Sequence, residues 1–266
     1  MHGVNRMAIE ASLTARHVAI VTLHRPELHN AFDDALIAEL TAELRRLDAD
    51  DSVRIVVLAA AGKSFSAGAD LHWMRRMAAY DEAQNLADAR ALAELMRTLD
   101  GLSKPVIAQV QGAAYGGGVG LIACCDVVIA AETASFCLSE TRLGLIPAVI
   151  SPYVVAAIGA RQARRWCVSA EAFDAATALR LGLVHEVVAP ERLAARVDEL
   201  LATLAGNGPQ AMREAKRLVR DVAGRPLDAA LIDDTARRIA RLRASPEGRE
   251  GVSAFLDKRA PAWRDG

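Results

Sequence analysis

The stretch AAYGGGVGLIACC, residues 113–125, constrains the fold more than any other part of this sequence. Its four glycines, Gly116, Gly117, Gly118 and Gly120, fall within five positions between two apolar runs. A glycine costs about 0.5–1 kcal/mol relative to alanine inside a helix. The apolar residues that follow are typical of a short buried helix. We therefore expect the glycines to let a ligand, or another segment, approach the backbone closely.

The composition describes a globular chain without a dedicated nucleic-acid surface. Of 266 residues, 52% are hydrophobic, which is enough for a large core. The 32 Lys and Arg nearly balance the 33 Asp and Glu, whereas nucleic-acid-binding domains are usually basic. The four cysteines form no CxxC pair, which favours reduced core thiols in a cytoplasmic protein over disulfides or zinc. No signal peptide is expected in residues 1–17, and the polar and glycine residues within 106–125 exclude a membrane helix there.

Hydrophobic periodicity predicts strands alternating with helices in the first part of the chain. Leucines recur on one helical face within 33–50, and again within 84–99. From Pro190 onward the pattern is nearly all helical. We therefore expect a β/α part, residues 1–190, and a helical part, residues 191–266. Short apolar runs of strand type occupy 16–26, 53–62, 106–112, 126–132, 134–138 and 182–188.

Two strand-to-helix junctions, residues 65–73 (FSAGADLHW) and 111–125, are the strongest candidates for a functional site. Small residues precede a helix in both, so backbone N–H groups there lack intrahelical partners. Such groups can bind a phosphate or the oxyanion of a reacting carbonyl. The lysine-bearing P-loop pattern is absent and G-x-G-x-x-G is not matched, which disfavours nucleotide binding. Glycines that serve tight packing alone are the structural alternative.

The ordered set of motifs resembles the crotonase, or enoyl-CoA hydratase, family over nearly the whole chain. Membership implies an α/β fold, with a spiral core of repeated ββα turns and a helical C-terminal region used for assembly as a homotrimer or a dimer of trimers. It also implies an acyl-CoA substrate, with no separate cofactor. The six histidines show no metal-ligand spacing, so no metal is expected, and no membrane partner is expected either. The matching pieces are HRPELHNAFDDALIAEL (24–40), FSAGADLHWM (65–74), KPVIAQVQGAAYGGGVGLIACCDVVIAAETASFCLSETRLGLIP (104–147), ARRWCVSAEAFDAATALRLGLVHEVV (163–188) and GVSAFLDKRAPAW (251–263).

The resemblance implies an oxyanion hole and one acid/base residue. The backbone N–H groups of Ala69 and Gly117 would hold the thioester carbonyl of an acyl-CoA. Hydratases of the family commonly use two glutamates; one is present as Glu140, and the other falls on Gly120. We therefore expect Glu140 to be the sole acid/base and Gly120 to make room for a bulkier branched acyl group. The alternative for Glu140 is an exposed or salt-bridged carboxylate near Arg142.

The same resemblance assigns further residues to the CoA moiety. The first loop, residues 66–70, would lie against the bend between the adenosine and pantetheine parts of CoA. Arg25 would also contact CoA. Phe255 and Lys258 would reach the adenine and phosphates, with an ordinary amphipathic helix as the alternative. The other residues of this set are Ser66, Ala67, Gly68, Asp70, Leu71 and Gly116.

A finer resemblance, in GGGVGL, FCLSETRLGLIPAVISPYV and ADLHWMRRM, is to bacterial 3-methylglutaconyl-CoA hydratases of leucine degradation and to hydratases of isoprenoid glutaconyl-CoA esters. Those substrates carry a free carboxylate, which needs a cation when buried. Arg75, Arg76 and Arg142 are candidates; surface charges or CoA phosphate contacts are the alternatives for the first two. His72 is a candidate for the acyl pocket, with a packing role as its alternative.

The expected activity is therefore reversible hydration of 3-methylglutaconyl-CoA to 3-hydroxy-3-methylglutaryl-CoA. The first alternative is other enolate chemistry by the same site, as in an isomerase, a decarboxylase or a thioesterase. The second is a non-catalytic protein that binds CoA or RNA. The absent glutamate at Gly120 supports that alternative, as does a basic helix face, although such a face is usually solvated. The basic residues are Arg213, Lys216, Arg217 and Arg220.

Overall fold

The computed structural model describes residues 8–264, so residues 1–7, the start of the segment in which no signal peptide is expected, lie outside it. The chain forms two compact units. Within the described residues, the first unit holds 8–102 and 106–198, and the second holds 103–105 and 199–264. No helix in this described part is long and apolar enough to cross a membrane.

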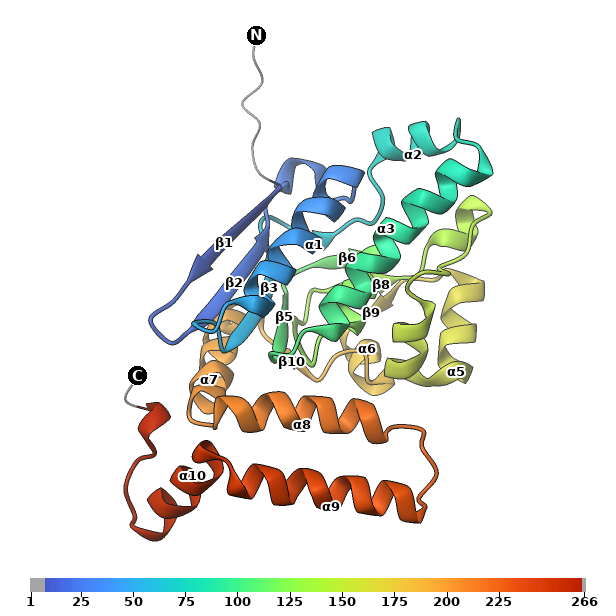
Figure 1. Ribbon diagram of the computed structural model, residues 1–266. Helices are drawn as coiled ribbons and strands as arrows, with labels where there is room; N and C mark the ends of the chain where they lie inside the picture. The colour runs from blue at the N-terminus through green and yellow to red at the C-terminus, as the bar shows by residue number, and fades with distance from the viewer. Residues whose placement is uncertain (1–7, 265–266) are drawn as a thin grey trace. The chain divides into compact units, whose positions relative to one another are not determined.

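The first unit contains a six-stranded sheet (Figure 1). Valine, isoleucine and alanine fill its inner strands, which are buried almost throughout because helices and loops cover both faces of a parallel sheet. The first strand pairs antiparallel with the second, and all other neighbours are parallel. In sheet order the strands are β1 (Ile9–Leu13), β2 (Val18–Leu23), β3 (Ile55–Ala60), β5 (Val106–Val110), β7 (Val127–Ala131) and β10 (Glu186–Val188).

A second, smaller sheet of this unit consists of β4 (Ser64–Ser66), β6 (Ala113–Tyr115), β8 (Ser135–Cys137) and β9 (Phe173–Asp174). β4, β6 and β8 are parallel, and β9 runs antiparallel to β8. Along the chain, β3 is followed by β4, β5 by β6 and β7 by β8, so each pair places one strand in each sheet. A helical segment follows each pair. This arrangement confirms the predicted spiral of ββα turns.

The helices of the first unit follow the predicted apolar spacing. Asp33 caps the first helix, because its side chain accepts a hydrogen bond from Leu36 N. This helix buries Leu36, Leu40, Leu44 and Leu47. The α-helices are α1 (Asp34–Ala49), α2 (Leu71–Met77), α3 (Glu82–Gly101), α4 (Gly117–Ala123), α5 (Ser151–Ser169) and α6 (Ala175–Leu181). Short 3₁₀ helices are η1 (Pro26–Leu28), η2 (Glu140–Leu143) and η3 (Pro190–Arg192), and α7 (Leu193–Ala205) contributes residues to both units.

The second unit consists largely of helices. Glu247 accepts hydrogen bonds from the backbone N of Gln210 at 2.9 Å and of Ala211 at 2.8 Å, so one helix caps the N-terminus of another. Lys216 Nζ donates to Lys104 O at 3.1 Å, which ties residues 103–105 to this unit. Its remaining elements are α8 (Pro209–Val222), α9 (Ala229–Ala244), α10 (Pro246–Leu256) and η4 (Ala262–Arg264).

The sequence pattern does not predict β1, β4, β6 or β9. β4 and β6 have three residues each, rich in serine and alanine, so alternation of apolar and polar residues cannot appear in them. They form because they pair with each other and with β8. Each glycine-containing loop therefore follows a strand of the small sheet, and the pairing of these strands determines the position of the loops.

Candidate active site

Three parallel strands of the small sheet end side by side. β4 is parallel to β6, and β6 is parallel to β8. Because the carboxyl ends of parallel strands meet at one edge of a sheet, segments 67–70, 116–118 and 138–140 gather at that edge. These segments contain the two predicted oxyanion donors and the predicted acid/base residue. The fold thus brings together the three residues that the sequence assigned to catalysis.

Ala69 presents a backbone N–H that the fold does not use. Phe32 forms a parallel bridge with Ala69: Phe32 N donates to Gly68 O, and Asp70 N donates to Phe32 O, both at 2.7 Å. The residue between the two bonded positions of such a bridge turns its own N–H to the opposite side. Ala69 is exposed, and its N–H has no acceptor within residues 8–264. This N–H is therefore available to a ligand.

The glycine run supplies a second available N–H at the start of α4. Gly116 precedes the helix with φ of 51° and ψ of −120°, a conformation that favours glycine. Val119 N and Gly120 N both donate back to Gly116 O, at 2.9 and 3.4 Å. In the described part of the chain, Gly117 N and Gly118 N have no acceptor, as is usual in the first turn of a helix.

The two glycine-containing loops touch each other. A Cβ at Gly68 would lie 3.2 Å from Tyr115 O, and a Cβ at Gly116 would lie 3.9 Å from Gly68 Cα. A Cβ at Gly118 would lie 3.0 Å from the Cβ of Ser66. Side chains at these positions would push the loops apart. The glycines therefore have a packing role, and the same close approach brings the available N–H groups to one place.

Glu140 lies over the glycine run. It opens η2 directly after β8, and a Cβ at Gly116 would lie 3.2 Å from Glu140 Oε1. Glu140 Oε2 is buried and has no hydrogen-bond partner among the described residues. Burial raises the pKa of this carboxyl above its ordinary value of 4.5, and a hydrogen bond with its own backbone opposes the rise. A half-buried carboxyl with a raised pKa beside free N–H donors is a candidate acid/base.

Arg142 does not neutralise Glu140. The arginine is exposed, and its side chain forms no ion pair or hydrogen bond within residues 8–264. Glu140 likewise has no ion pair in this part of the chain. The alternative that Glu140 is an exposed or salt-bridged surface carboxylate is therefore wrong, because one carboxylate oxygen is buried without a cation.

Gly120 does not make room for a ligand, and this expectation is wrong. A Cβ at position 120 would lie 2.2 Å from Ile150 Cγ2 and 3.3 Å from Met96 Cε. Ile150 is 2% exposed and Met96 is fully buried. Protein interiors are close-packed, so a neighbouring side chain fills the space that a missing one leaves. Ile150 is not among the site residues predicted from the sequence; it follows Gly120 only after thirty positions and is recognisable only from its contact.

Arg25 and Asp70, both predicted to contact CoA, form ion pairs within the fold. Arg25 Nη1 donates to Asp33 Oδ2 at 2.6 Å, and Arg25 Nη2 lies 3.8 Å from Asp70 Oδ2. Asp70 also caps α2, because its side chain accepts hydrogen bonds from the backbone N of His72 and Trp73. Both charged side chains thus hold the segments around the first loop, and their contact with CoA stays a prediction.

Asn30 anchors the first loop, although it is not among the site residues predicted from the sequence. The residue is fully buried with φ of 53°. Its Nδ2 donates to Ala61 O at 2.8 Å and to Ser64 O at 2.9 Å, and its Oδ1 accepts from Arg25 N at 2.9 Å. Its carbonyl accepts from Ser66 Oγ at 2.9 Å. The only sequence signal is the residue type, because asparagine tolerates positive φ better than most residues.

The residues of α2 that were predicted to bind CoA or the acyl group are exposed. Leu71 is 69% exposed, and His72, Arg75 and Arg76 are exposed as well. Arg76 Nη2 donates to Asp34 Oδ1 at 2.5 Å, which favours the surface-charge alternative for this arginine. The side chains of His72 and Arg75 have no hydrogen bond or ion pair within the described residues. The exposure of His72 contradicts a buried packing role.

Phe255 and Lys258 belong to the second unit, on α10 and just after it. Phe255 is 82% exposed, and Lys258 is exposed. An ordinary amphipathic helix would bury an aromatic side chain on its own unit. The exposure of Phe255 therefore favours a contact with something else, and the assignment of both residues to CoA stays a prediction.

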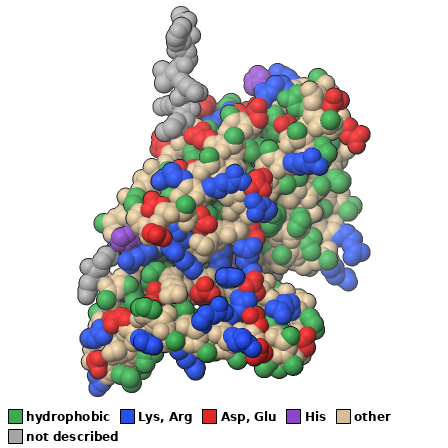
Figure 2. All heavy atoms as spheres, in the orientation of Figure 1, with side chains coloured by type: hydrophobic (Ala, Val, Ile, Leu, Met, Phe, Trp, Pro, Cys, Tyr) green, Lys and Arg blue, Asp and Glu red, His purple; other side chains and the backbone are tan. Residues whose placement is uncertain are grey.

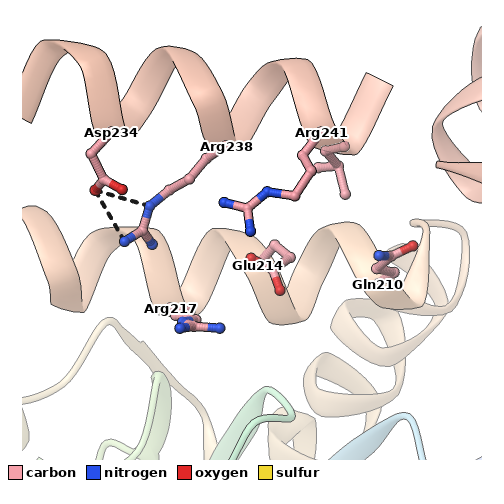
Figure 3. Close-up of a pocket in the computed structure, with 7 residues that line it drawn as sticks. Gln210, Glu214, Arg217, Asp234, Arg238 and Arg241 are labelled. Atoms are coloured by element: carbon pink, nitrogen blue, oxygen red, sulfur yellow. Dashed lines mark hydrogen bonds and ion pairs between the residues drawn. The ribbon is translucent and has the colours of Figure 1, made fainter. Parts of the chain in front are cut away.

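A hollow of about 260 Å³ lies between α8 and α9 (Figure 3). Arg238 is paired there with Asp221 at 2.6 Å and with Asp234 at 3.1 Å. Arg217, on the basic face, lies 3.6 Å from Asp221, so acids of the same unit partly neutralise that face. Figure 2 shows both signs of charge interspersed on the visible face. No residue predicted for catalysis or CoA binding lines this hollow, which is formed by Gln210, Glu214, Arg217, Asp234, Arg238, Arg241 and Leu242.

The described residues contain no group of three or more His, Cys, Asp or Glu that could hold a metal ion. All four cysteines are free thiols, and three of them, Cys124, Cys125 and Cys137, are buried. The edge of the small sheet offers the unpaired Glu140 carboxyl and the available backbone N–H groups, whereas the Asp70 carboxyl there is taken up by the cap of α2 and by Arg25.

Comparison with known proteins agrees with this geometry. A sequence profile of the enoyl-CoA hydratase/isomerase family matches residues 14–266. The 2,3-dehydroadipyl-CoA hydratase of Escherichia coli K12 is 35% identical over 251 residues, covering 94% of this chain and 96% of that protein. The mevalonyl-coenzyme A hydratase of Aspergillus fumigatus is 33% identical over 258 residues, covering 95% and 93%. The crystal structure of an enoyl-CoA hydratase from Shewanella pealeana superposes with a TM-score of 0.93, at 48% identity and 96% coverage of each chain.

Proposed function

Because the chain belongs to the enoyl-CoA hydratase/isomerase family and is an enoyl-CoA hydratase, we propose that it reversibly hydrates a branched enoyl-CoA, 3-methylglutaconyl-CoA, to 3-hydroxy-3-methylglutaryl-CoA. The observation that carries the proposal is the buried, unpartnered carboxylate oxygen of Glu140 beside two available N–H groups. One acid/base residue then has to serve both proton transfers of the hydration.

The two N–H groups, of Ala69 and Gly117, would bind the thioester carbonyl oxygen of the substrate. Negative charge develops on this oxygen when water adds to the β-carbon, because the electrons of the double bond move into an enolate. A donor placed against such an oxyanion contributes about 2.7–4 kcal/mol to the transition state. The same interaction withdraws electrons from the conjugated β-carbon and makes it electrophilic.

Glu140 would move both protons. Its carboxylate takes a proton from water as the new C–O bond forms at the β-carbon. The resulting carboxylic acid then gives a proton to the α-carbon as the enolate collapses, so one water molecule is added in total. A raised pKa of Glu140 suits both steps. It makes the carboxylate a stronger base toward water, and it keeps the carboxyl protonated until the proton is transferred to the α-carbon. Since Ile150 fills the space at Gly120, no second carboxylate shares the work there.

The free carboxylate of the proposed substrate needs a cation. Arg75 and Arg142 are exposed, and their side chains have no partner among the described residues, so either is available to form an ion pair with this carboxylate. Arg76 already pairs with Asp34. The name of the Escherichia coli relative, 2,3-dehydroadipyl-CoA hydratase, denotes a dicarboxylic acyl group as well. This supports a carboxylate-bearing acyl chain in preference to a simple straight chain.

The test is a panel of CoA esters, 3-methylglutaconyl, 2,3-dehydroadipyl and crotonyl, with identification of the products. We expect the first ester to have the highest kcat/KM, and we expect Glu140→Gln to reduce it by about 10²–10⁴-fold. Glu132→Gln is the matched control, because this glutamate is exposed and lies at the end of another strand, β7. Wild-type turnover by Glu140→Gln would contradict the mechanism. A shifted double bond, loss of CO₂ or free CoA as the product would instead indicate isomerase, decarboxylase or thioesterase chemistry.

We also propose that the protein assembles as a trimer or a dimer of trimers. The support is the exposed apolar side chains of the second unit, because burial against another subunit would remove their surface from water. Light scattering is expected to give three or six times the chain mass of 28.4 kDa, and a monomer would contradict the proposal. The most exposed apolar side chains of this unit are Leu227, Phe255, Leu256 and Val219.

A further inference from the structure

Phe32 contacts both segments that carry the proposed oxyanion donors. Its backbone brackets the first donor, because Phe32 N and O are bonded to Gly68 and Asp70, the two neighbours of Ala69. The bond to Gly68 O, at 2.7 Å, holds the peptide group that carries the Ala69 N–H, and the bond from Asp70 N, also at 2.7 Å, holds the next peptide group. A displacement of Phe32 would therefore also displace the backbone N–H of Ala69.

The ring of Phe32 lies against the second donor. A Cβ at Gly117 would lie 2.7 Å from Phe32 Cε2 and 2.9 Å from Phe32 Cδ2. The ring is thus in direct contact with the backbone of the residue that supplies the second N–H. Phe32 is 2% exposed, so the surrounding core leaves the ring little freedom to turn away.

The residues on either side hold Phe32 itself in place. Asn30, two positions earlier, is fully buried and bonded through both its side chain and its carbonyl. Asp33, the next residue, caps α1 and accepts a hydrogen bond from Arg25. The aromatic ring therefore projects from a fixed backbone segment.

We propose that Phe32 is a positioning residue that sets the separation of the two oxyanion donors, with its backbone holding Ala69 and its ring holding Gly117. This inference rests on the proposed function, because it assumes that these two N–H groups bind the thioester oxygen. Oxyanion stabilisation requires donors placed to within a fraction of an ångström, and a displacement of about 1 Å costs about 100-fold in rate. A smaller side chain at position 32 removes the ring atoms against which the backbone of Gly117 packs, so that this backbone can shift.

The first experiment compares Phe32→Leu and the less disruptive Phe32→Met with Phe173→Leu. Phe173 is a matched control, because it is a buried phenylalanine of the same unit, on β9, that packs on Phe136 and Trp166. We expect both Phe32 variants to lose about 10- to 100-fold in kcat with little change in KM. We expect Phe173→Leu to keep the wild-type kcat although its folded state is less stable.

A spectroscopic measurement separates positioning from general loosening of the core. A cinnamoyl-CoA thioester with an electron-donating ring substituent absorbs further to the red when its carbonyl is polarised. We expect the red shift on binding to be smaller with the Phe32 variants than with wild type and unchanged with Phe173→Leu. An undiminished red shift and wild-type kcat in both Phe32 variants would overturn the inference.

A double-mutant cycle tests the ring contact directly. Gly117→Ala alone should be nearly inactive, because its methyl group would overlap the ring of Phe32. Adding Phe32→Ala should raise the activity at least 10-fold over Gly117→Ala, because the space of the ring becomes free. Strictly additive effects would overturn the inference while Glu140→Gln remains inactive. A fully active Glu140→Gln would instead refute the proposed mechanism on which the inference rests.

Discussion

Ile150 occupies the space that a side chain at position 120 would need: a Cβ there would lie 2.2 Å from Ile150 Cγ2 and 2.8 Å from Ile150 Cβ. The missing side chain and the isoleucine thus form a complementary pair in the core. A carboxylate could enter at position 120 only if position 150 became smaller. The two positions together determine that this active site has a single glutamate in the proposed mechanism.

The first prediction concerns this packing. Gly120→Ala should lower the free energy of unfolding by about 1–3 kcal/mol, because the added methyl group overpacks the core against Ile150. Ile150→Ala in the same chain should restore part of the loss, so the double variant should be more stable than the sum of the two single changes. Urea unfolding of the four proteins measures this coupling.

Gly101→Ala is the control for that cycle, because a Cβ at this helical position would meet nothing within 4 Å. It should match wild type or be slightly more stable, since alanine favours a helix over glycine. If Gly120→Ala were as stable as Gly101→Ala, the backbone of α4 would have to shift away from Ile150, and the tight contact would not be a constraint on sequence.

The second prediction concerns the pH dependence of activity. Glu140 has to be ionised to accept a proton from water, and burial raises its pKa above 4.5. Activity should therefore fall on the acid side through a pKa that is higher than that of an ordinary glutamate. The measurement is kcat/KM against pH, and the residual activity of Glu140→Gln should lack this acid limb. An acid limb that persists in Glu140→Gln would assign the titration to another group.

The third prediction concerns stability. The folded protein binds the Glu140 proton more tightly than the unfolded chain, where the pKa is about 4.5. The free energy of unfolding should therefore fall as the pH rises through the interval between these two values. Glu140→Gln removes this titration. It should raise Tm relative to wild type at about pH 8, and the difference should shrink at about pH 4.

Glu250 provides the opposite case in the same chain. Its hydrogen bond with Arg259 lowers the pKa of Glu250 to about 2, so its contribution to stability is present above the ordinary pKa and is lost as the pH falls toward 2. Glu250→Gln should therefore lower Tm at neutral pH. Equal and parallel Tm changes for both glutamine variants would show that the substitutions act through packing rather than through proton binding.

Much of the fold could be predicted from local sequence patterns. The buried face of α1 and the strands β3, β5 and β7 carry regular or continuous apolar signals, and the structure confirms them. The resemblance to a family identified the two loops and Glu140 as site candidates. The parallel pairing of β4, β6 and β8 then explains physically why those segments, far apart along the chain, meet.

The rest of the site depends on contacts that no local pattern records. Phe32 and Ile150 look like ordinary apolar residues in the sequence, and only their contacts with Gly117 and Gly120 give them a specific place. For the same reason, the expectation that Gly120 leaves open space is wrong. A sequence shows that a side chain is absent, but not which neighbour has filled the volume.

The last prediction concerns Asp70, which links the first loop to α2. One carboxylate oxygen caps the helix by accepting from His72 N and Trp73 N, and the other faces Arg25 at 3.8 Å. Its backbone N also donates to Phe32 O beside the first oxyanion donor. Asp70→Ala should lose about 1 kcal/mol of stability through the lost cap. It should also reduce kcat, because the turn that holds the donor is loosened.

Asp70→Asn separates these effects, since an amide oxygen still caps the helix but the charge opposite Arg25 is gone. It should keep most of the stability and of kcat if the cap positions the donor, and lose kcat if the ion pair does. Asp174→Ala is the matched control, because Asp174 caps α6, which has seven residues like α2. It should be less stable than wild type but equally active. If Asp174→Ala lowered kcat as much as Asp70→Ala, general destabilisation would explain both losses, and the cap would have no special part in placing the donor.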